Sequence, residues 1–438
     1  MSDVRPTTGD SGWFTNDRFG LFIHWGIYAL PARHEWVKQI EQTPDDVYQR
    51  YFDHFDPDLY DPTLWAQAAS GAGMKYFVIT TKHHDGFCLW DSQLTDYKVT
   101  NTPYGKDLIA PMVEAFRAQD MRVGFYHSLI DWHHPDFIID DVHAMRNHPD
   151  RDKLNEPRDQ KRYAAYLRGQ TRELLTGFGK VDLLFYDFSY PAGSHGRPDT
   201  FVGKGRADWD SENLIKMVRE LQPDILVDDR LDLDDVVGGW DYRTPEQFMM
   251  RKWLEWKGQR VVWETCQTFS GSWGYHRDEA TWKSVDQLLM LLIDTVGKGG
   301  NLLLGLFSMA VLWSGLGAIG GVIDWTTINT VVFQGGPEGF GPTAVNIIFG
   351  SWFGRILIET GIARTIIRKA VELGGDKPAL TCVLLCVVTT AIFTTAYGAG
   401  AVVAIGVIVF PIMLSLGISK HLATGSFAMS VGCGLYFN

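Results

Sequence analysis

The first 304 residues alternate short apolar runs with longer stretches in which apolar residues recur at helical spacing. The short runs are typical of buried strands, and the longer stretches predict amphipathic helices, most clearly at 107–119, 160–178, 211–221 and 284–296. Strands that alternate with helices favour a parallel α/β fold, and eight such units predict a (β/α)8 barrel. The predicted strands are 19–24, 76–82, 122–127, 183–187, 225–228, 240–244, 261–264 and 301–304.

Nearly every predicted strand ends in a side chain that can bind or react. In a (β/α)8 barrel the carboxyl ends of the strands, with the loops that follow them, form the active site. Any one of these residues alone could be an ordinary surface loop residue. Their recurrence at the same place in successive units favours a shared site. They are His24, His83, His84, His127, Asp187, Asp228, Asp229, Arg230, Glu246 and Glu264.

Residues 305–438 follow a different pattern, in which apolar and small side chains dominate. The run 378–419 contains no Asp, Glu, Lys or Arg and is about twice as long as the roughly 20 residues of one membrane span. Several glycines and Pro411 interrupt it, which favours either two spans with a tight turn or a broken, re-entrant helix pair. The segment after residue 304 lacks an amphipathic pattern. We therefore expect a barrel (1–304) without its usual eighth helix, followed by an all-α, transmembrane-like segment (305–438).

Charge divides the chain at the same place. Up to residue 304 there are 34 Lys plus Arg and 47 Asp plus Glu, a net of 34 − 47 = −13, whereas the remainder has 6 and 5, a net of +1. An acidic first part without a basic stripe argues against nucleic acid as a partner. Its many Trp and Tyr suit a sugar or another small ligand. The N-terminus lacks the apolar core of a signal peptide, so we expect a cytoplasmic first part and a membrane-embedded C-terminal segment.

Neither the cysteines nor the histidines are spaced as metal ligands. The five cysteines form no CxxC pair. Adjacent histidines such as His83 and His84 point to opposite faces of a strand, and no HExxH pattern accompanies them. The glycine-rich segment 297–301 precedes a strand and does not open a helix, unlike a phosphate-binding loop. No metal and no cofactor are predicted.

Several segments of the first part follow one another in a characteristic order. They are RFGLFIHWGIYALPARHEWV, KYFVITTKHHDGFCLWDS, VGFYHSLIDW, DLLFYDF, TPEQ, WETC with SWGY, and GKGGNLLL. Together they resemble the catalytic domain of the retaining α-L-fucosidases of glycoside hydrolase family 29, over residues 13–304. The resemblance implies an enzyme that releases terminal α-L-fucose from oligosaccharides or glycoconjugates through a covalent glycosyl-enzyme, without a cofactor.

The resemblance makes Asp187 the expected nucleophile. Retaining glycosidases place two carboxyl groups about 5–5.5 Å apart, one of which attacks the anomeric carbon. Asp187 ends the apolar run 181–186, and we expect Phe185, Tyr186 and Phe188 to form walls around it. The family commonly has Trp-x-Asp-Gly where this chain has Phe-Tyr-Asp-Phe, a change that concerns fine specificity. A cap for the next helix is the alternative role of Asp187.

Two glutamates compete for the role of general acid/base. Glu246, in the segment TPE, matches the position that carries this role in some members of the family, and we favour it. Glu264, in the segment WET at the end of the seventh predicted strand, is the rival, with a structural salt bridge as its alternative role. Burial against Trp and Tyr is expected to raise the pKa of the acid/base, because such a group must hold its proton near neutral pH.

The remaining site residues are expected to bind the sugar. Imidazoles and carboxylates can bind sugar hydroxyls, and aromatic faces pack on C–H groups. Trp273 or Tyr275 is expected against the methyl group of fucose. The resemblance places around the sugar His24, Glu35, Trp36, His83, His84, Tyr126 and Arg230.

The C-terminal part carries a second resemblance. The segments FGSWFGR (349–355) and ETGIAR (359–364), with the apolar run after them, resemble part of a gluconate-permease-type membrane transporter. The tail is too short for a whole transporter, which needs many more spans. The alternative function is therefore a transporter fragment, or an inactive sugar-binding head tethered to a membrane.

Overall fold

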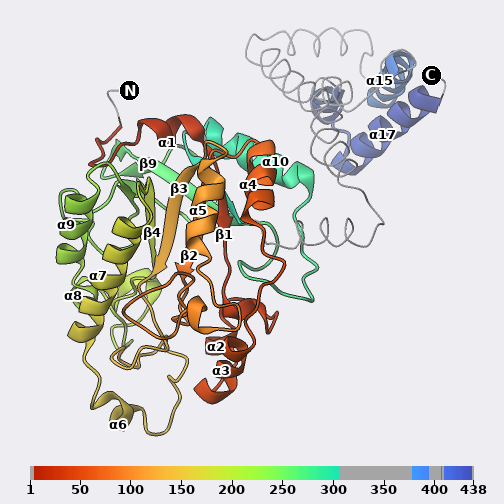
Figure 1. The fold of residues 1–438 in the computed structure, drawn as a ribbon. Coiled ribbons are helices and arrows are strands. Elements are labelled where there is room, and N and C mark those ends of the chain that lie inside the picture. The colour runs from red at the N-terminus through yellow and green to blue at the C-terminus, as the bar shows by residue number, and fades with distance from the viewer. Residues whose placement is uncertain (1–3, 306–376, 394–405, 407–408, 437–438) are drawn as a thin grey trace. The chain divides into compact units, whose positions relative to one another are not determined.

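The computed structural model describes residues 4–305, 377–393, 406 and 409–436 (Figure 1). The chain divides into two compact units, Met1–Val322 and Ile323–Asn438. The boundary between them falls within residues 306–376, which lie outside the described residues. The predicted division after residue 304 and the predicted absence of the eighth barrel helix fall there too, and both stay predictions.

Eight parallel strands form a nearly closed barrel in the first unit, as predicted. Their order is β5-β4-β3-β2-β1-β10-β9-β6, and a parallel bridge between Asp228 and Tyr242 joins the two ends of the sheet. The barrel strands are β1 (Phe19–Ile23), β2 (Tyr76–Lys82), β3 (Arg122–Ser128), β4 (Leu183–Asp187), β5 (Leu226–Val227), β6 (Tyr242–Arg243), β9 (Val262–Thr268) and β10 (Asn301–Gly305).

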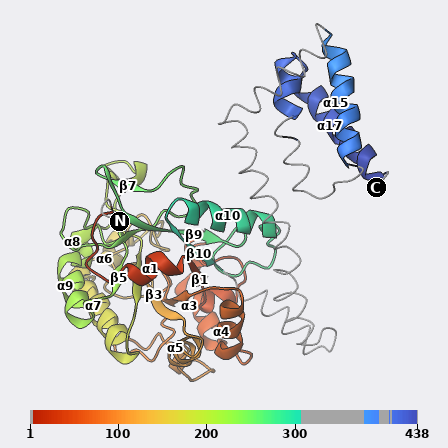
Figure 2. The ribbon, with the colours of Figure 1, turned by 90° about the horizontal axis from the view of Figure 1, so that it is seen from above.

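Helices surround the strands, as Figures 1 and 2 show. The outer helices are α4 (Pro62–Gly71), α5 (Ile109–Arg117), α7 (Gln160–Gly177), α8 (Arg206–Trp209), α9 (Ser211–Leu221) and α10 (Val285–Gly297). Helix α1 (Gly12–Asp17) lies across one end of the barrel (Figure 2), where Trp13 and Phe14 pack on the inner core. Three short helices, α2 (Val37–Ile40), α3 (Asp45–Asp53) and α6 (Arg151–Asn155), lie towards the end of the barrel away from the N-terminus (Figure 1).

The remaining elements are small and lie in loops. They are the 3-10 turns η1 (Ile27–Ala29), η2 (Val99–Asn101) and η3 (Ser194–Gly196), and a hairpin of β7 (Glu255–Trp256) and β8 (Gln259–Arg260). Several helices begin at a polar cap. The Asp61 carboxylate accepts the backbone N–H groups of Thr63 and Leu64 at the start of α4, and Ser284 with Gln287 forms a capping box at α10.

Successive side chains of each strand point to opposite faces of the sheet, so the barrel unit has two hydrophobic cores, one outside the barrel and one inside it. Outward-facing residues of the strands, such as Phe77 and Ile79, pack against the helices. Inward-facing residues, such as Phe22, Tyr126 and Leu303, fill the barrel itself. Because large side chains occupy the interior, a ligand can enter only at a barrel mouth.

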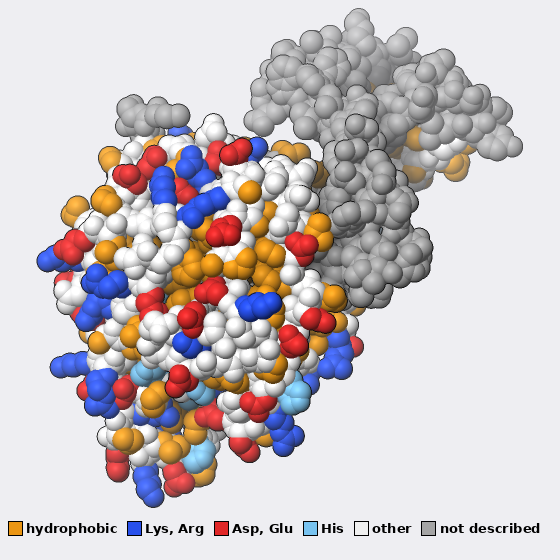
Figure 3. Space-filling view, in the orientation of Figure 1, with side chains coloured by type: hydrophobic (Ala, Val, Ile, Leu, Met, Phe, Trp, Pro, Cys, Tyr) orange, Lys and Arg blue, Asp and Glu red, His pale blue; other side chains and the backbone are white. Residues whose placement is uncertain are grey.

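Charged side chains of both signs are interspersed over the face of the barrel unit in Figure 3. Many charged side chains of this unit pair locally, for example Arg33 with Glu41 at 2.6 Å and Arg206 with Asp235 at 2.8 Å. Exposed pairs of this kind each contribute only about 0–1 kcal/mol to stability. Their effect is to mix the two signs of charge over this face.

In the second unit the structure describes two longer helices, α15 (Pro378–Phe393) and α17 (Lys420–Tyr436), which pack against each other. Val409, Met413, Ala423 and Phe427 form a small buried core there. Among the described helices, none combines the length and apolar character needed to cross a bilayer. The prediction of membrane spans in 378–419 therefore lacks support from these residues, and residues 394–405 and 407–408 of that run lie outside them.

Candidate active site

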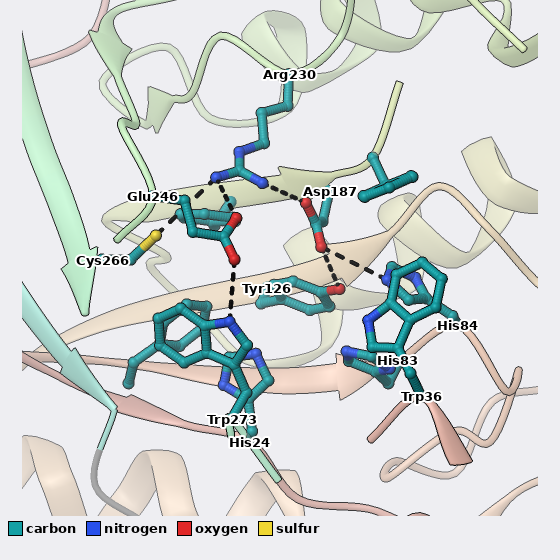
Figure 4. Close-up of a pocket in the computed structure, with 13 residues that line it drawn as sticks. His24, Trp36, His83, His84, Tyr126, Asp187, Arg230, Glu246, Cys266 and Trp273 are labelled. Atoms are coloured by element: carbon teal, nitrogen blue, oxygen red, sulfur yellow. Dashed lines mark hydrogen bonds and ion pairs between the residues drawn. The ribbon is translucent and has the colours of Figure 1, made fainter. Parts of the chain in front are cut away.

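A pocket of about 360 Å³, its open mouth included, lies where the inner layer of the barrel meets the loops that follow the strands. It is lined by nine of the residues expected to act in catalysis or sugar binding, and Figure 4 shows how they face one another. Of the residues that the resemblance placed in the site, Glu35 and Glu264 do not line the pocket. The lining residues are Phe22, His24, Trp36, His83, His84, Tyr126, Phe185, Asp187, Phe188, Arg230, Glu246, Cys266 and Trp273.

Asp187, the last residue of β4, is held by three neighbours. Its Oδ1 accepts a hydrogen bond from Arg230 at 2.6 Å, its Oδ2 accepts one from the Tyr126 hydroxyl at 2.8 Å, and His84 Nε2 lies 3.7 Å from the same Oδ2. Burial and then the Asp187 carboxylate raise the pKa of Tyr126 well above its ordinary value, so that hydroxyl keeps its proton and donates. The carboxylate is therefore fixed in orientation, and only 13% of its side chain is exposed.

Glu246 follows β6 and reaches the same pocket. Its Oε2 accepts a hydrogen bond from Arg230 at 3.0 Å, and its Oε1 accepts one from Trp273 Nε1 at 3.0 Å. The backbone beside it is fixed, because the Gln247 N–H donates to the Cys266 carbonyl at 3.0 Å. Since 41% of the Glu246 side chain is exposed, this carboxyl group is far more accessible to solvent than Asp187.

Arg230 bridges the two carboxyl groups with a single guanidinium (Figure 4). The Nε–H of Arg230 donates to the Thr244 hydroxyl oxygen at 2.9 Å. The central carbon of the guanidinium lies 4.8 Å from the centre of the Phe185 ring. Burial lowers the pKa of Arg230, but the Asp187 and Glu246 carboxylates raise it more, so the group stays charged. A rigid planar cation with one nitrogen on each carboxylate fixes their spacing.

Three histidines present neutral rings to the pocket. Burial, followed by neighbouring charges, lowers the pKa of His24, His83 and His84 well below the ordinary value. His84 Nδ1 lies 2.6 Å from the Ser128 hydroxyl, whereas Nδ1 of His24 and Nδ1 of His83 are buried without a hydrogen-bond partner in the protein. Buried polar atoms are normally paired, so these two nitrogens suit the hydroxyls of a ligand.

Aromatic rings enclose the rest of the pocket. On one side the Trp273 ring stacks on His24 at 4.8 Å and lies 5.4 Å from Phe22. Tyr126 stacks on Phe185 at 5.8 Å in the same layer. Such faces pack well on the C–H groups of a sugar. Of the two aromatic residues expected near a methyl group, Trp273 lines the pocket and Tyr275 does not.

The structure places Glu264, the rival acid/base, below the pocket. It is fully buried inside the barrel, next to Asn301 at the start of β10, and its Oε2 accepts a hydrogen bond from the Tyr76 hydroxyl. Burial raises the pKa of Glu264 to about 8, against the opposing effect of the Tyr76 hydrogen bond. The rise in pKa that we expected for the acid/base is thus found at Glu264, which lies outside the pocket. The hydrogen-bond partner of Glu264 is a tyrosine, so the salt bridge considered as its alternative role is not formed.

Glu35 also lies behind the pocket lining. Its Oε2 accepts the backbone N–H of Gly274 at 2.7 Å, and His34 Nδ1 lies 3.7 Å away. A Cβ atom at Gly274 would lie 3.1 Å from Glu35, a tight contact that glycine avoids. Glu35 thereby holds the turn that carries Trp273, and its direct contact with a sugar stays a prediction.

Three other residues named from the strand ends, His127, Asp228 and Asp229, do not line the pocket. The His127 ring contacts the Thr81 hydroxyl at 3.1 Å, and Asp228 accepts the Tyr186 N–H at 3.1 Å. The Tyr186 hydroxyl contacts Thr171 on α7. The expectation that Tyr186 forms a wall around Asp187 was wrong, because alternate residues of a strand point to opposite faces.

The sequence reasoning missed two lining residues, Phe22 and Cys266. Each lies two positions from a polar residue that was recognised, Phe22 before His24 and Cys266 after Glu264. Period two along the strands could have identified both. In the part of the chain that the structure describes, no three His, Cys, Asp or Glu side chains are grouped as metal ligands.

Comparisons with known proteins match the first part of the chain. The α-L-fucosidase family model matches residues 6–310. Tissue alpha-L-fucosidase from Homo sapiens is 29% identical over 331 residues, which cover 69% of this chain and 63% of that protein. Alpha-L-fucosidase from Dictyostelium discoideum is 26% identical over 323 residues, which cover 67% and 64% of the two chains.

Solved structures agree. Alpha-L-fucosidase isoenzyme 1 from Paenibacillus thiaminolyticus has a TM-score of 0.61 and 45% identity, with coverage of 67% of this chain and 69% of that one. A GH29 alpha-L-fucosidase from Bacteroides thetaiotaomicron has a TM-score of 0.57 and 27% identity, with 70% of each chain covered.

The chain spans about 63% of the length of the human relative. None of these matches supports the resemblance of the tail to a permease. The family model, the barrel and the arrangement of Asp187, Arg230 and Glu246 all agree for residues 6–310. The chain belongs to the α-L-fucosidase family.

Proposed function

We propose that this chain is a retaining α-L-fucosidase that hydrolyses terminal α-L-fucose from oligosaccharides or glycoconjugates. One observation carries the proposal: Asp187 and Glu246 face one pocket and share one guanidinium, that of Arg230. Retaining glycosidases need two carboxyl groups about 5–5.5 Å apart. A single planar cation between the two carboxylates favours such a short separation.

In the first step Asp187 acts as the nucleophile. Its carboxylate oxygen forms a bond to the anomeric carbon while the bond from that carbon to the leaving oxygen breaks. Glu246, in its protonated form, gives its proton to the leaving oxygen. The difference in exposure supports this assignment, because the enclosed Asp187 suits attack within the pocket and the accessible Glu246 can meet the departing group.

In the second step Glu246 acts as the base. Its carboxylate takes a proton from a water molecule, the water oxygen bonds to the anomeric carbon, and the bond to Asp187 breaks. Arg230 donates to Oε2 of Glu246 and Trp273 donates to Oε1. Each carboxylate oxygen can accept a further hydrogen bond, so a leaving oxygen or a water molecule can meet Glu246 while both donors stay in place.

The pocket lining fits one deoxy sugar. The imidazole rings of His24 and His83 line the pocket and can bind hydroxyls. Phe22, Phe185 and Trp273 offer an apolar surface that suits a methyl group. The thirteen lining residues enclose a small pocket at the barrel mouth, which suits a single terminal sugar.

Hydrolysis of phenyl α-L-fucoside by the full chain tests the proposal, with two isosteric variants as a matched pair. The poor phenolic leaving group needs acid assistance, so Glu246→Gln should lower kcat/KM by about 10²–10⁴. Glu264→Gln keeps an acceptor for the Tyr76 hydroxyl and should stay within about tenfold of the parent. Lack of hydrolysis by the folded parent would contradict the function, and a larger loss in Glu264→Gln would contradict the assignment of Glu246.

No observation among the described residues favours the alternative of a transporter fragment or an inactive head on a membrane. The two transporter-like segments, 349–355 and 359–364, lie outside the described residues, as do 394–405 and 407–408 of the apolar run 378–419. The described helices lack a candidate span.

A further inference from the structure

Phe188, directly after the proposed nucleophile, has an unusual backbone conformation. Its φ is 81°, in the left-handed region where a side chain with a Cβ atom is strained and an aromatic residue is rare. The chain is fixed on both sides of it. The Asp187 carbonyl accepts the Leu129 N–H at 3.0 Å, and the Tyr190 N–H donates to the Lys204 carbonyl at 2.8 Å. The strain is therefore confined to the turn that leaves β4.

The ring of Phe188 is held among other rings and faces the pocket. Its centre lies 5.3 Å from Trp36, 5.7 Å from His84 and 5.3 Å from Tyr190. Trp36, His84 and Phe188 all line the pocket, and we call these three residues the aromatic wall. This wall stands beside Asp187, because His84 also approaches the Asp187 carboxylate at 3.7 Å.

Gln247 has the same kind of backbone conformation as Phe188 and shows whether that conformation requires a side chain in the pocket. Gln247 follows Glu246 directly and has a φ of 58°, so both proposed catalytic carboxylates precede a left-handed residue. The Gln247 amide, however, donates to the Thr268 hydroxyl at 3.0 Å and does not line the pocket. The left-handed turn by itself thus does not require a side chain in the pocket.

We propose that Phe188 determines specificity: its ring closes the side of the pocket next to Asp187 and admits only a sugar without an additional substituent on that side. The proposal rests on the proposed function and extends it. A glycine would satisfy the turn without strain. The aromatic ring occupies space that a substituted sugar would need, while its face packs on the C–H groups of an unsubstituted one.

Two variants separate the effect of the backbone from that of the ring. Phe188→Ala and Phe188→Gly both remove the ring, but only glycine relieves the left-handed conformation. The Gly variant should therefore unfold at a temperature higher than the Ala variant by about 2 °C. Lys257→Gly is the matched control, since Lys257 has a φ of 49° in the exposed β7–β8 turn, and it should leave catalysis unchanged.

The specificity test compares nitrophenyl α-L-fucoside with its 2-, 3- and 4-O-methyl derivatives. The ratio of kcat/KM between at least one derivative and the unsubstituted fucoside should rise about tenfold or more in both Phe188 variants, and not in Lys257→Gly. Unchanged ratios for all three derivatives would overturn the proposal, even if overall activity fell. A merely structural role of the ring would lower all rates together.

Calorimetric binding of L-fucose and its O-methyl derivatives distinguishes failure of this proposal from failure of the function. If the parent binds L-fucose but hydrolyses no fucoside, the proposed function fails. The affinity for each O-methyl derivative relative to L-fucose, compared between the parent and the variants, then still tests the proposal about Phe188. If the parent hydrolyses fucosides and the variants keep its preferences in both assays, the proposal about Phe188 fails alone. A parent that neither binds nor hydrolyses contradicts both.

Discussion

Glu246 and Glu264 have similar sequence surroundings but very different environments. Each lies near an apolar run, and Glu264 even has a Trp beside it. In the fold one side chain is 41% exposed at the pocket, and the other is fully buried inside the barrel. The sequence could not separate them, because depth along the barrel depends on the register of β9 with its neighbours.

The buried Glu264 should make stability depend on pH. Its pKa is raised to about 8 by burial, against 4.5 as the ordinary value of glutamate. Between these values the folded chain holds a proton that the unfolded chain has lost. The contribution of Glu264 to the free energy of unfolding should therefore be largest below about pH 4.5. It should fall as the pH rises towards 8, by about 1.4 kcal/mol per pH unit at most.

Urea unfolding of the parent and of Glu264→Gln between pH 5 and pH 8.5 measures this contribution. The variant lacks the titrating group, so its stability should fall less over that range. Parallel profiles for the parent and Glu264→Gln would contradict the assignment of the raised pKa to this residue.

Most of the pocket residues could be named from the sequence, because the family motifs carry them in order. The residues Asp187, Arg230 and Glu246 do face one another, as the resemblance implied. Their hydrogen bonds could not be predicted, since they depend on the direction in which each loop leaves its strand. The left-handed backbone of Phe188 is a further feature of this kind.

The strands were predicted closely, and one difference has consequences for the site. The seventh predicted strand, 261–264, corresponds to β9 (Val262–Thr268), which continues further. Its last residues, Gln267 and Thr268, are polar yet buried, so hydropathy alone could not show the continuation. With the true end of β9 at Thr268, Glu264 lies within the strand and Cys266 reaches the pocket.

The contact between β1 and β2 offers a test of the barrel interior. Gly20 pairs with Tyr76 on the neighbouring strand, and a Cβ atom at Gly20 would clash with the Tyr76 ring. The hydroxyl group of the same tyrosine donates a hydrogen bond to Glu264. Gly20→Ala should therefore lower the free energy of unfolding by about 1–3 kcal/mol. Urea or thermal unfolding measures the change.

Gly71→Ala provides the matched control, because a Cβ atom there would meet nothing within 4 Å at the end of α4. Alanine favours a helix over glycine, so this variant should be neutral or slightly stabilised. Equal stability of Gly20→Ala and the parent would contradict the close packing of the barrel interior.

The chain joins a barrel of known family to a second unit of different composition. The family model ends at residue 310, and the chain spans about 63% of the length of its human relative. The fold of the first unit followed from periodicity, because most of its barrel strands and long helices have a clear pattern. The membrane interpretation of the tail rested on a long apolar run and on a resemblance to part of a transporter, and the described helices do not support it.

The central claim is that this whole chain forms a covalent glycosyl-enzyme on Asp187. The most direct test is release of nitrophenol from an aryl α-L-fucoside by the full chain and by Asp187→Gly, with and without azide. We predict that the variant loses nearly all activity and that azide, which fits the space of the missing carboxylate, restores turnover with β-fucosyl azide as the product. Loss of activity without rescue in a folded variant, or full activity in the variant, would contradict Asp187 as the nucleophile.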